Sequence, residues 1–394
     1  MELGVAMLKS RQALSLLSTE PSSADSDAIP VDSKVASRIV DLRSDTVTKP
    51  TAEMRAAMAS AEVDDDLLGV DPTVCKLQQQ MAKIFGKEAG LFVPSGTMGN
   101  LMGVLVHCEV RGSEVILGSE CHLHIYEQGG MSTLGGVHPR TVLNKADGTM
   151  DLQEVEAAIR PLNDDCYPTT RLICIENTHN RCGGKCISVE YTDKIGELAK
   201  WYGLKFHIDG ARIFNAATAL GVSPERLTRA ADSISVCLSK GLAAPVGSVL
   251  VGSSEFIAKA RKLRKALGGG MRQAGVIAAA GLISLRDMVG KLKDDHHHAQ
   301  LLAEGLNAIA GLKVDVANVE TNIVNVEVTT DSALGAEDLC EAMKERGVLS
   351  IATQGTRIRL VTHYHISNDD VQYVLACFQD TLLKTIAVHR ENGI

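Results

Sequence analysis

Short apolar runs alternate with helix-compatible segments along the first two thirds of the chain. The runs lie at 90–94, 114–117, 172–176, 204–208 and 234–238. This alternation is typical of an α/β fold with a mostly parallel sheet and helices on both of its faces. In such open sheets, ligands bind beyond the carboxyl ends of the strands. We therefore expect the chemistry in the residues that follow each run.

The pattern changes after a long helical stretch at about 275–309. Strands are predicted at 313–316, 322–328 and 357–362, together with a helix near 336–346 and a final helix that starts near Asn368. This mixture is typical of a smaller α+β domain. The sequence thus predicts a large domain at 39–290, which includes an N-terminal arm, and a small C-terminal domain at 291–394.

The first 38 residues are rich in Ser, Ala and Asp and have no sustained apolar face. We expect a disordered N-terminal extension there. A short basic amphipathic helix around Met7–Leu17 would suit mitochondrial import, which we keep as a minority alternative. Glu2 and Glu20 argue against that alternative, because transit peptides are poor in acidic residues.

The charge balance and the cysteine content argue against some classes of function and indicate a cellular location. The 394 residues carry 40 Lys and Arg against 48 Asp and Glu, a net charge of −8. Such a chain has no broad positive field for nucleic acid, and it lacks the roughly 20-residue apolar stretch that a membrane span needs. Several of the ten cysteines lie inside apolar runs. We therefore expect free thiols, a reducing compartment and a cytoplasmic location.

Lys240 and Asp209 follow two of the predicted strands. A lysine at a strand end can form a Schiff base when its amine deprotonates readily. A carboxylate buried at a strand end needs a cationic partner, and the protonated ring nitrogen of pyridoxal phosphate would be one. The two residues therefore suggest the two ends of one cofactor, with a structural salt bridge from Asp209 to Arg212 as the alternative.

Other polar residues at the carboxyl-end edge of the predicted sheet could complete such a site. Ser95, Gly96 and Thr97 precede a helix-compatible run, and the free N–H groups of a helix N-terminus bind phosphate. His122 could lie over an aromatic ring or transfer a proton, and His124 competes for that role.

Arg212 and Arg359 are candidates to bind a carboxylate, because a planar guanidinium group can donate two parallel hydrogen bonds to it. Arg359 alternates with Arg357 along a predicted strand, so one of that pair must face outward. Residues 296–298 are three consecutive histidines that would point in different directions from a helix, so we interpret them as solvated surface and predict no metal site. The glycines at 268–270 predict a flexible junction before Arg272.

These segments resemble the L-threonine aldolases of the low-specificity type, which are fold-type I pyridoxal-phosphate enzymes. The resemblance runs from about residue 39 to the C-terminus. Its motifs are DLRSDTVT at 41–48, FVPSGTMGN at 92–100, ENTHN at 176–180, HIDGAR at 207–212, LSKG at 238–241, GGGMRQAG at 268–275 and RLVTH at 359–363.

The resemblance implies a role for each cofactor-binding residue. Lys240 would carry the Schiff base with pyridoxal 5'-phosphate, Asp209 would meet the pyridine nitrogen, and His122 would stack on the ring. Gly96 and Thr97 would hold the phosphate. We count Ser95 and Arg212 with the cofactor-binding residues as well.

The resemblance also implies the substrate site and the assembly. Ser44, Arg212 and Arg359 would hold the carboxylate of the amino acid. Arg272 would reach the phosphate of a neighbouring subunit, which implies a homotetramer with shared sites. The sequence departs from the family at 68–72, where Leu68 and Val70 stand in LGVDP and many members have YGEDP. Substrate preference or rate could differ as a result.

The implied reaction is retro-aldol cleavage of L-threonine or L-allo-threonine to glycine and acetaldehyde. His122, or a water that it positions, is the candidate base, and His124 and Glu127 remain alternatives. Another fold-type I reaction, such as serine hydroxymethyl transfer or β-elimination, is the runner-up. A third alternative is a paralogue that binds pyridoxal phosphate without turnover.

Overall fold

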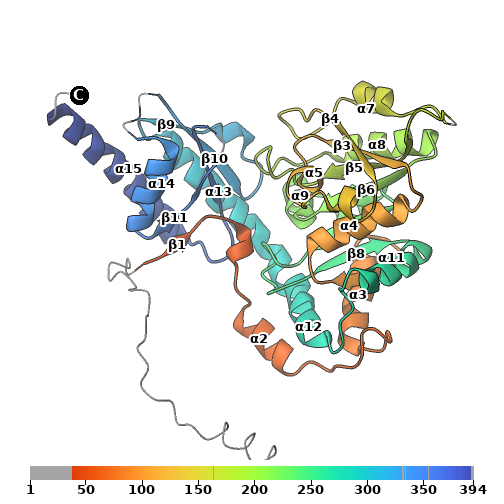
Figure 1. Ribbon diagram of the computed structural model, residues 1–394. Helices are drawn as coiled ribbons and strands as arrows, with labels where there is room; N and C mark the ends of the chain where they lie inside the picture. Colours follow the sequence, from red (N-terminus) through yellow and green to blue (C-terminus); the bar gives the residue numbers. More distant parts are fainter. Residues whose placement is uncertain (1–37, 163, 331, 333, 354, 392–394) are drawn as a thin grey trace, which may run out of the picture. The chain divides into compact units, whose positions relative to one another are not determined.

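The computed structural model describes residues 38–391 except 163, 331, 333 and 354 (Figure 1). Of the disordered extension expected at 1–38, residues 1–37 lie outside the described residues. One compact unit begins at Arg38, whose guanidinium forms an ion pair of 2.6 Å with Asp370 in the last helix. Among the described helices, none has the length and apolarity needed to cross a membrane.

The larger sheet has seven strands in the order β2-β8-β7-β6-β5-β3-β4. Strands β3 to β7 are mutually parallel, whereas β8 runs antiparallel to both of its neighbours. The predicted mostly parallel α/β sheet is therefore confirmed. The strands are β2 (Ala89–Val93), β3 (Ser113–Gly118), β4 (His138–Val142), β5 (Thr169–Glu176), β6 (Lys205–Gly210), β7 (Ser233–Cys237) and β8 (Ser248–Gly252).

Helices cover this sheet and connect its strands (Figure 1). A polar side chain caps the N-terminus of many of them, as Ser188 caps α8 and Ser253 caps α11. Such caps satisfy backbone N–H groups that have no partner within the helix. The helices around the sheet are α3 (Pro72–Ile84), α4 (Gly96–His107), α5 (His122–Ile125), α6 (Gly130–Thr133), α7 (Leu152–Ala158), α8 (Val189–Trp201), α9 (Ile213–Leu220), α10 (Pro224–Thr228) and α11 (Ser254–Ala266). The preceding helix, α2 (Ala52–Ala59), packs against α12 (Gly275–Ile283) instead.

The central strands are buried on both faces, which explains their continuous apolar runs. Ile173 of β5, Phe206 of β6 and Ile234 of β7 are fully buried in one large hydrophobic cluster. Their polar residues at the carboxyl ends are therefore the exceptions, and each of them needs a partner.

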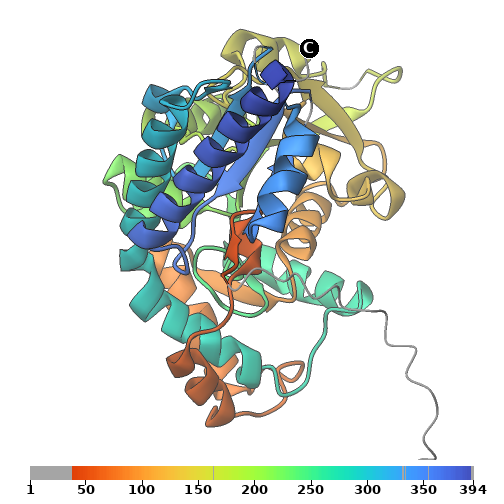
Figure 2. The same ribbon diagram turned by 90° about the vertical axis from the view of Figure 1, so that its left-hand side faces the viewer.

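The C-terminal part has a second sheet in the order β12-β13-β10-β9, with antiparallel pairing throughout. Figure 2 shows α15 in front of this sheet, between α13 (Leu292–Asn307) and α14, and residues of all three helices belong to a second hydrophobic cluster. The elements are β9 (Leu312–Lys313), β10 (Ile323–Val328), α14 (Ala336–Glu345), β12 (Ile351–Ala352), β13 (Arg357–Val361) and α15 (Asn368–Glu391).

The start of the described chain pairs with this C-terminal part. Strand β1 (Val40–Asp41) lies parallel to β11 (Val348–Leu349), and Val40 and Leu42 belong to the second hydrophobic cluster. A 3-10 turn, η1 (Asp45–Val47), follows. The division into domains at 39–290 and 291–394 stays a prediction.

The helical stretch expected at about 275–309 is not continuous. It contains α12 (Gly275–Ile283), a π-helical turn (Ser284–Met288), a 3-10 turn (Val289–Lys291) and α13 (Leu292–Asn307). A further 3-10 turn (Val316–Asn318) replaces the end of the strand expected at 313–316.

The expectation of a solvated surface at 296–298 is wrong for His296. Its ring lies 3.1 Å from the amide of Asn215, and burial lowers its pKa to about 4. The neighbouring Asp295 is also buried, and its Oδ2 has no hydrogen-bond partner among the described residues. Burial and the nearby charge of Asp45 raise the pKa of Asp295 to about 8.

Candidate active site

A cavity of about 270 Å³ lies at the carboxyl ends of β6 and β7. This is the edge of a parallel sheet at which ligands bind, as the sequence predicted. The residues around it come from the β2–α4 turn, α4, the start of α5 and the segment after it, the ends of β6 and β7, and the segments that follow these two strands. They are Pro94, Ser95, Gly96, Thr97, Asn100, His122, Glu127, Asp209, Ala211, Cys237, Ser239, Lys240, Pro245, Val246 and Gly247.

One end of the cavity is the N-terminus of α4. Ser95 is the N-cap, and its hydroxyl accepts a hydrogen bond of 3.2 Å from the N–H of Met98. A Cβ built at Gly96 would lie 2.6 Å from Sγ of Cys237, so only glycine leaves room at this point. Free N–H groups, the hydroxyl of Thr97 and the positive end of the helix dipole make this end suitable for a phosphate.

Asp209 also lines the cavity, and it is only 2% exposed. Its Oδ2 accepts a hydrogen bond of 3.0 Å from Nδ2 of Asn100, and its Oδ1 accepts one of 3.0 Å from the N–H of Ala211. Burial and the charge of Glu176 raise the pKa of Asp209. No cation of the described residues forms an ion pair with it. Asp209 thus fits a cationic ligand atom, such as a protonated ring nitrogen.

The alternative pairing of Asp209 with Arg212 is wrong. Arg212 forms a bidentate pair with Asp45, with Nε and the second guanidinium nitrogen 2.7 and 2.6 Å from its carboxylate oxygens. Burial opposes ionisation of Asp45, but the charge and hydrogen bonds of Arg212 hold the pKa of Asp45 below its usual range. The Nδ2 of Asn322 also donates to this carboxylate, at 3.2 Å.

Arg359 lies beside this pair. It donates a hydrogen bond of 2.9 Å to Oδ1 of Asn180, and Arg212 approaches the same oxygen at 3.4 Å. Burial and the charge of Arg212 lower the pKa of Arg359 to about 10. The alternation along β13 is confirmed, since Arg357 is exposed. Two adjacent guanidinium groups with one neutralising carboxylate leave net positive charge for an anion.

Ser44 stands next to this cluster. Its hydroxyl caps the 3-10 turn η1 by accepting from the N–H of Thr46, and it lies 3.4 Å from Asp45. Four residues further along the same arm, Thr48 donates a hydrogen bond of 2.9 Å to the main-chain oxygen of Lys240. The N-terminal arm therefore joins the arginine cluster to the lysine loop.

His122 and Glu127 form a hydrogen-bonded pair at the wall of the cavity. Nδ1 of His122 lies 2.8 Å from Oε1 of Glu127, and the N–H of His122 donates to Glu176 at 2.7 Å. Burial opposes protonation of the ring, yet the hydrogen bond to Glu127 raises the pKa of His122. Burial and the charge of Asp209 raise the pKa of Glu127. His124 is exposed and does not line the cavity.

Atoms of His122, Glu127 and Asp209 lie within 4.8 Å of one another, a spacing that could hold a metal ion. However, Asn100 already donates to both carboxylates, and His122 donates to Glu127. A metal ion would displace these hydrogen bonds. These three side chains are therefore better suited to contact an organic ring, at one face and one edge, than to bind a metal ion.

The structure does not bring Arg272 into this cavity. Its side chain is 61% exposed and forms an ion pair of 2.8 Å with Asp65. Leu68 and Val70, where the sequence departs from the resemblance, are exposed on the same loop as Asp65. Sequence reasoning gave no role to Asn100, Asp45 or Asn180, although all three lie within the quoted motifs.

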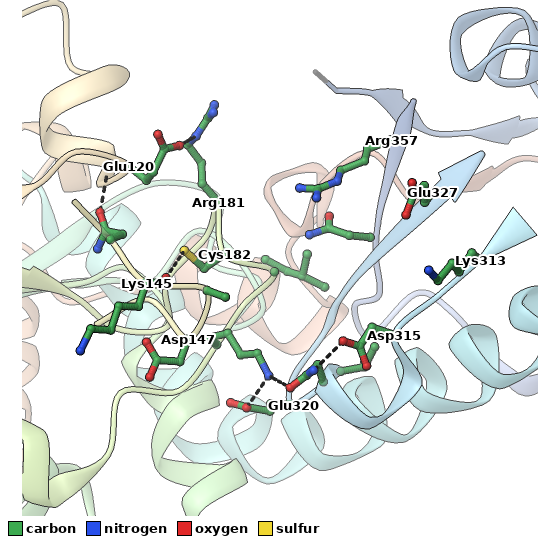
Figure 3. Close-up of a pocket in the computed structure, with 18 residues that line it drawn as sticks. Glu120, Lys145, Asp147, Arg181, Cys182, Lys313, Asp315, Glu320, Glu327 and Arg357 are labelled. Carbon is green, nitrogen blue, oxygen red and sulfur yellow. Dashed lines mark hydrogen bonds and ion pairs between the residues drawn. The ribbon is translucent and has the colours of Figure 1, made fainter. Parts of the chain in front are cut away.

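A larger cavity of about 770 Å³ lies elsewhere and contains neither Lys240 nor Asp209. Figure 3 shows Glu120 and Arg181 on one side of it and Glu327 and Arg357 on the other. Several of its charges neutralise one another, as in the pairs Arg181–Glu120 and Lys185–Glu320. The smaller cavity, in which a lysine, a buried carboxylate and a helix N-terminus converge, is the candidate active site.

Comparison with known proteins assigns the family. The model of the beta-eliminating lyase family matches residues 41–329. The chain is 62% identical to a probable low-specificity L-threonine aldolase 2 of Arabidopsis thaliana over 343 residues. The aligned residues are 87% of this chain and 97% of that protein. It belongs to the beta-eliminating lyase family, with the low-specificity L-threonine aldolases.

A further relative and two solved structures are less similar to this chain. The low specificity L-threonine aldolase of Escherichia coli K12 is 43% identical over 338 residues, which are 86% of this chain and 98% of that protein. A putative L-allo-threonine aldolase structure from Listeria monocytogenes has a TM-score of 0.71 at 22% identity and covers 84% of this chain and 92% of that chain. The Leishmania major threonine aldolase structure has a TM-score of 0.73 at 17% identity and covers 87% and 99%. These structures confirm the fold predicted from the sequence.

Proposed function

We propose that this protein is a pyridoxal-phosphate-dependent lyase that cleaves L-threonine and L-allo-threonine to glycine and acetaldehyde. One observation carries the proposal: Lys240, the buried Asp209 and the N-terminus of α4 surround a single cavity of about 270 Å³. Membership of the beta-eliminating lyase family and the similarity to low-specificity L-threonine aldolases support the same reaction.

The described residues fit pyridoxal phosphate at three points. Lys240 would hold it covalently, Asp209 would bind its ring nitrogen, and Ser95, Gly96 and Thr97 at the start of α4 would hold its phosphate. When bound, this cofactor withdraws electrons from the Cα of an attached amino acid. The cofactor would supply an ion-pair partner for the buried Asp209, which forms no ion pair with another described residue.

The arginines would set the orientation of the substrate. Arg212 is fixed by Asp45, and Arg359 is fixed by Asn180, so both forks are already positioned before substrate arrives. Together they would bind the carboxylate of the amino acid, with Ser44 beside them. A fixed carboxylate restricts rotation about Cα and presents the Cα–Cβ bond to the reacting face of the cavity.

His122 would take the proton of the β-hydroxyl, directly or through a water. Nδ1 of His122 lies 2.8 Å from Oε1 of Glu127, and an ionised carboxylate can only accept a hydrogen bond. Nδ1 would therefore carry the proton of the neutral ring, and Nε2 would carry the lone pair. Glu127 holds the ring in this tautomer, as an acidic partner does for other catalytic histidines. Glu127 is itself buried and bound to two donors, so we assign it the positioning role.

The proposal is tested by measuring acetaldehyde released from L-threonine and L-allo-threonine by the purified protein, with and without tetrahydrofolate. We expect release from both diastereomers without folate, and none from Lys240→Ala. Turnover only with folate would favour serine hydroxymethyl transfer, and pyruvate in place of aldehyde would favour β-elimination. Visible cofactor absorbance without any turnover would indicate a silent paralogue.

We further propose a homotetramer in which Arg272 reaches the phosphate site of a neighbouring subunit. The exposed Arg272 and the exposed apolar side chains of Leu68 and Val70 support an interface near this loop. Sites shared between subunits predict complementation. Refolding inactive Lys240→Ala together with inactive Arg272→Ala should restore part of the activity, and a strictly additive, inactive mixture would contradict the shared site.

The same reaction would supply glycine at the expense of threonine. We propose the cytoplasm as the location, because all ten cysteines are free and a reducing compartment preserves free thiols. Measuring the location of the tagged full chain, with its first 38 residues intact, distinguishes this proposal from mitochondrial import.

A further inference from the structure

The polar contacts of Asp209 continue away from the cavity into the protein. Asn100 lies on the face of α4 that packs against β6 and β7, with Gly96 and Gly103 on the same face. A Cβ built at Gly103 would lie 2.6 Å from Cε1 of His207, so glycine at 103 lets α4 approach the ring of His207. His207 and Asp209 are two residues apart on β6 and therefore point to the same face of the sheet.

Four buried or half-buried groups behind Asp209 form one hydrogen-bonded chain. His107 and His207 both contact Oγ of Ser233 at 2.8 Å, and His207 contacts Oδ1 of Asn100 at 3.3 Å. Burial and the charge of Lys205 lower the pKa of His107 to about 3, and burial and the presence of His107 lower the pKa of His207 to about 3. Both rings are therefore neutral at physiological pH.

The two carboxylates at the end of this series of hydrogen bonds determine which group donates in each bond. The carboxylates of Asp209 and Glu127 are acceptors, so both hydrogens of Nδ2 of Asn100 point at them, at 3.0 and 2.9 Å. Oδ1 of Asn100 must then accept from Nε2–H of His207, which leaves Nδ1 of His207 to accept from Ser233. Ser233 in turn accepts from His107. All donors point toward the two carboxylates.

Such an arrangement favours the ionised form of Asp209. A proton on Oδ2 would lose the hydrogen bond from Asn100, and hydrogen bonds to a charged carboxylate stabilise the charge. Without these donors, burial and the charges of Glu176 and Glu127 would favour the neutral acid, which cannot pair with a cationic ring. The charged groups that face Asp209 from the surrounding elements are Glu176, Glu127, Lys240 and His122.

We infer that Asn100 is a positioning residue that keeps Asp209 ionised for the cofactor, and that His207 fixes the orientation of the Asn100 amide. The inference rests on the proposed function, because it concerns the same cofactor. It assigns the two residues no contact with the substrate. A second consequence is that Asn100 couples Asp209 to the His122–Glu127 pair, since one amide group donates to both carboxylates.

The test measures binding of pyridoxal phosphate to the cofactor-free full chain as a function of pH. Asn100→Leu has a similar volume and no donor. We expect its dissociation constant for the cofactor to rise roughly 10- to 100-fold near neutral pH, the range typical of outer hydrogen-bond partners. The defect should shrink as pH increases, because alkaline pH ionises Asp209 without help. A purely structural defect would not be rescued by pH.

Two further variants keep the test informative if Asn100→Leu folds poorly. His207→Gln retains an N–H donor that can reach Oδ1 of Asn100, whereas His207→Leu removes it. We expect near-normal cofactor affinity for the first and a weaker, pH-sensitive defect for the second. Asn215→Leu is the matched control, because it removes a buried asparagine whose amide contacts His296 rather than a carboxylate.

The outcomes separate the inference from the proposed function. If wild-type protein binds the cofactor but does not cleave threonine, only the activity is wrong. If Asn100→Leu and His207→Leu bind the cofactor with the affinity and pH profile of the wild type, the role of Asn100 is wrong. Equal defects in Asn215→Leu would also overturn it, and failure of the wild type to bind the cofactor would overturn both.

Discussion

Two buried aspartates, Asp45 and Asp209, stand a short distance from the same lysine loop and differ in their partners. Asp45 is clasped by the guanidinium of Arg212, and its pKa is lowered. Asp209 receives hydrogen bonds from the neutral donors Asn100 and Ala211, and its pKa is raised. A buried charge is costly unless it is paired. The first aspartate is therefore complete within the chain, whereas the second is built to receive a cation from a ligand.

This difference separates structural from functional use of the same side chain. The Asp45–Arg212 pair joins the N-terminal arm to the segment after β6, and removing either partner would leave the other charge buried and unpaired. Asp209 contributes little to the stability of the cofactor-free chain, because burial and the charge of Glu176 offset much of what the hydrogen bonds from Asn100 and Ala211 contribute. Its contribution should appear only when the cofactor is bound. Substitution of Asp45 should consequently lower mainly the stability, whereas substitution of Asp209 should lower mainly the activity.

The largest effect is expected for Asp209→Asn. Loss of the charge that meets the ring nitrogen should lower kcat by roughly 100- to 1000-fold, which is typical for a group that stabilises developing charge. The cofactor-free protein should be as stable as the wild type or more stable, since a buried ionisable group is removed. Rates of aldehyde release and urea unfolding measure the two quantities. A large loss of stability in Asp209→Asn would contradict the claim that Asp209, unlike Asp45, has no structural role.

Asp45→Asn should do the reverse. It leaves the buried guanidinium of Arg212 without its carboxylate, and breaking a buried ion pair costs about 3 to 5 kcal/mol of unfolding free energy. Because Arg212 loses its fixed orientation, KM for threonine should rise more than kcat falls. Unfolding in urea and steady-state kinetics provide the readouts. Wild-type stability would show that Arg212 finds another partner.

Asp295 is a third buried aspartate, and its Oδ2 has no hydrogen-bond partner among the described residues. With a folded pKa of about 8, the native state keeps a proton that the unfolded chain releases near pH 4. The unfolding free energy of the wild type should therefore fall as pH rises from 4 to 8. Asp295→Asn should remove this fall and stabilise the protein by on the order of 2 kcal/mol at pH 8, with almost no effect at pH 4. Parallel pH profiles for the two proteins would contradict it.

The smallest expected effect is on the pH profile of catalysis. The hydrogen bond from His122 to Glu127 raises the pKa of His122, so neutral His122 becomes scarce as pH falls through that value. Glu127→Gln removes the charge and should lower the pKa, which moves the acid limb of kcat/KM to lower pH by about one unit. The measurement is kcat/KM for threonine from pH 5 to 9. An unmoved acid limb would exclude His122 as the proton acceptor.

The sequence predicted the parallel core because its strands are buried on both faces and appear as continuous apolar runs. It did not predict β4, whose residues HPRTV form a partly exposed edge strand without an apolar run. It also did not predict β8, which is apolar but inserts antiparallel between β2 and β7. The direction and neighbours of a strand depend on pairing with distant segments, which a local pattern does not contain.

The candidate site was predictable where a residue follows a strand. Lys240, Asp209 and the turn at Ser95 fall at strand ends, so the sheet rule placed them together. Asn100 lies in the first turn and a half of a helix, and its role depends on which face of α4 meets β6. Asp45 contacts Arg212 across 167 positions of the chain, a pairing that requires the fold. The assignment of Arg212 to the substrate site stays a prediction, whereas its alternative pairing with Asp209 is wrong because its guanidinium binds Asp45.

The most direct test of the central claim is to reduce the holoenzyme with borohydride, digest it and identify the peptide that carries the phosphopyridoxyl group. We predict a single labelled peptide with the modification on Lys240, and a strongly decreased yield in Asp209→Asn. Label on a different lysine, or no label on a protein that nevertheless cleaves threonine, would contradict it.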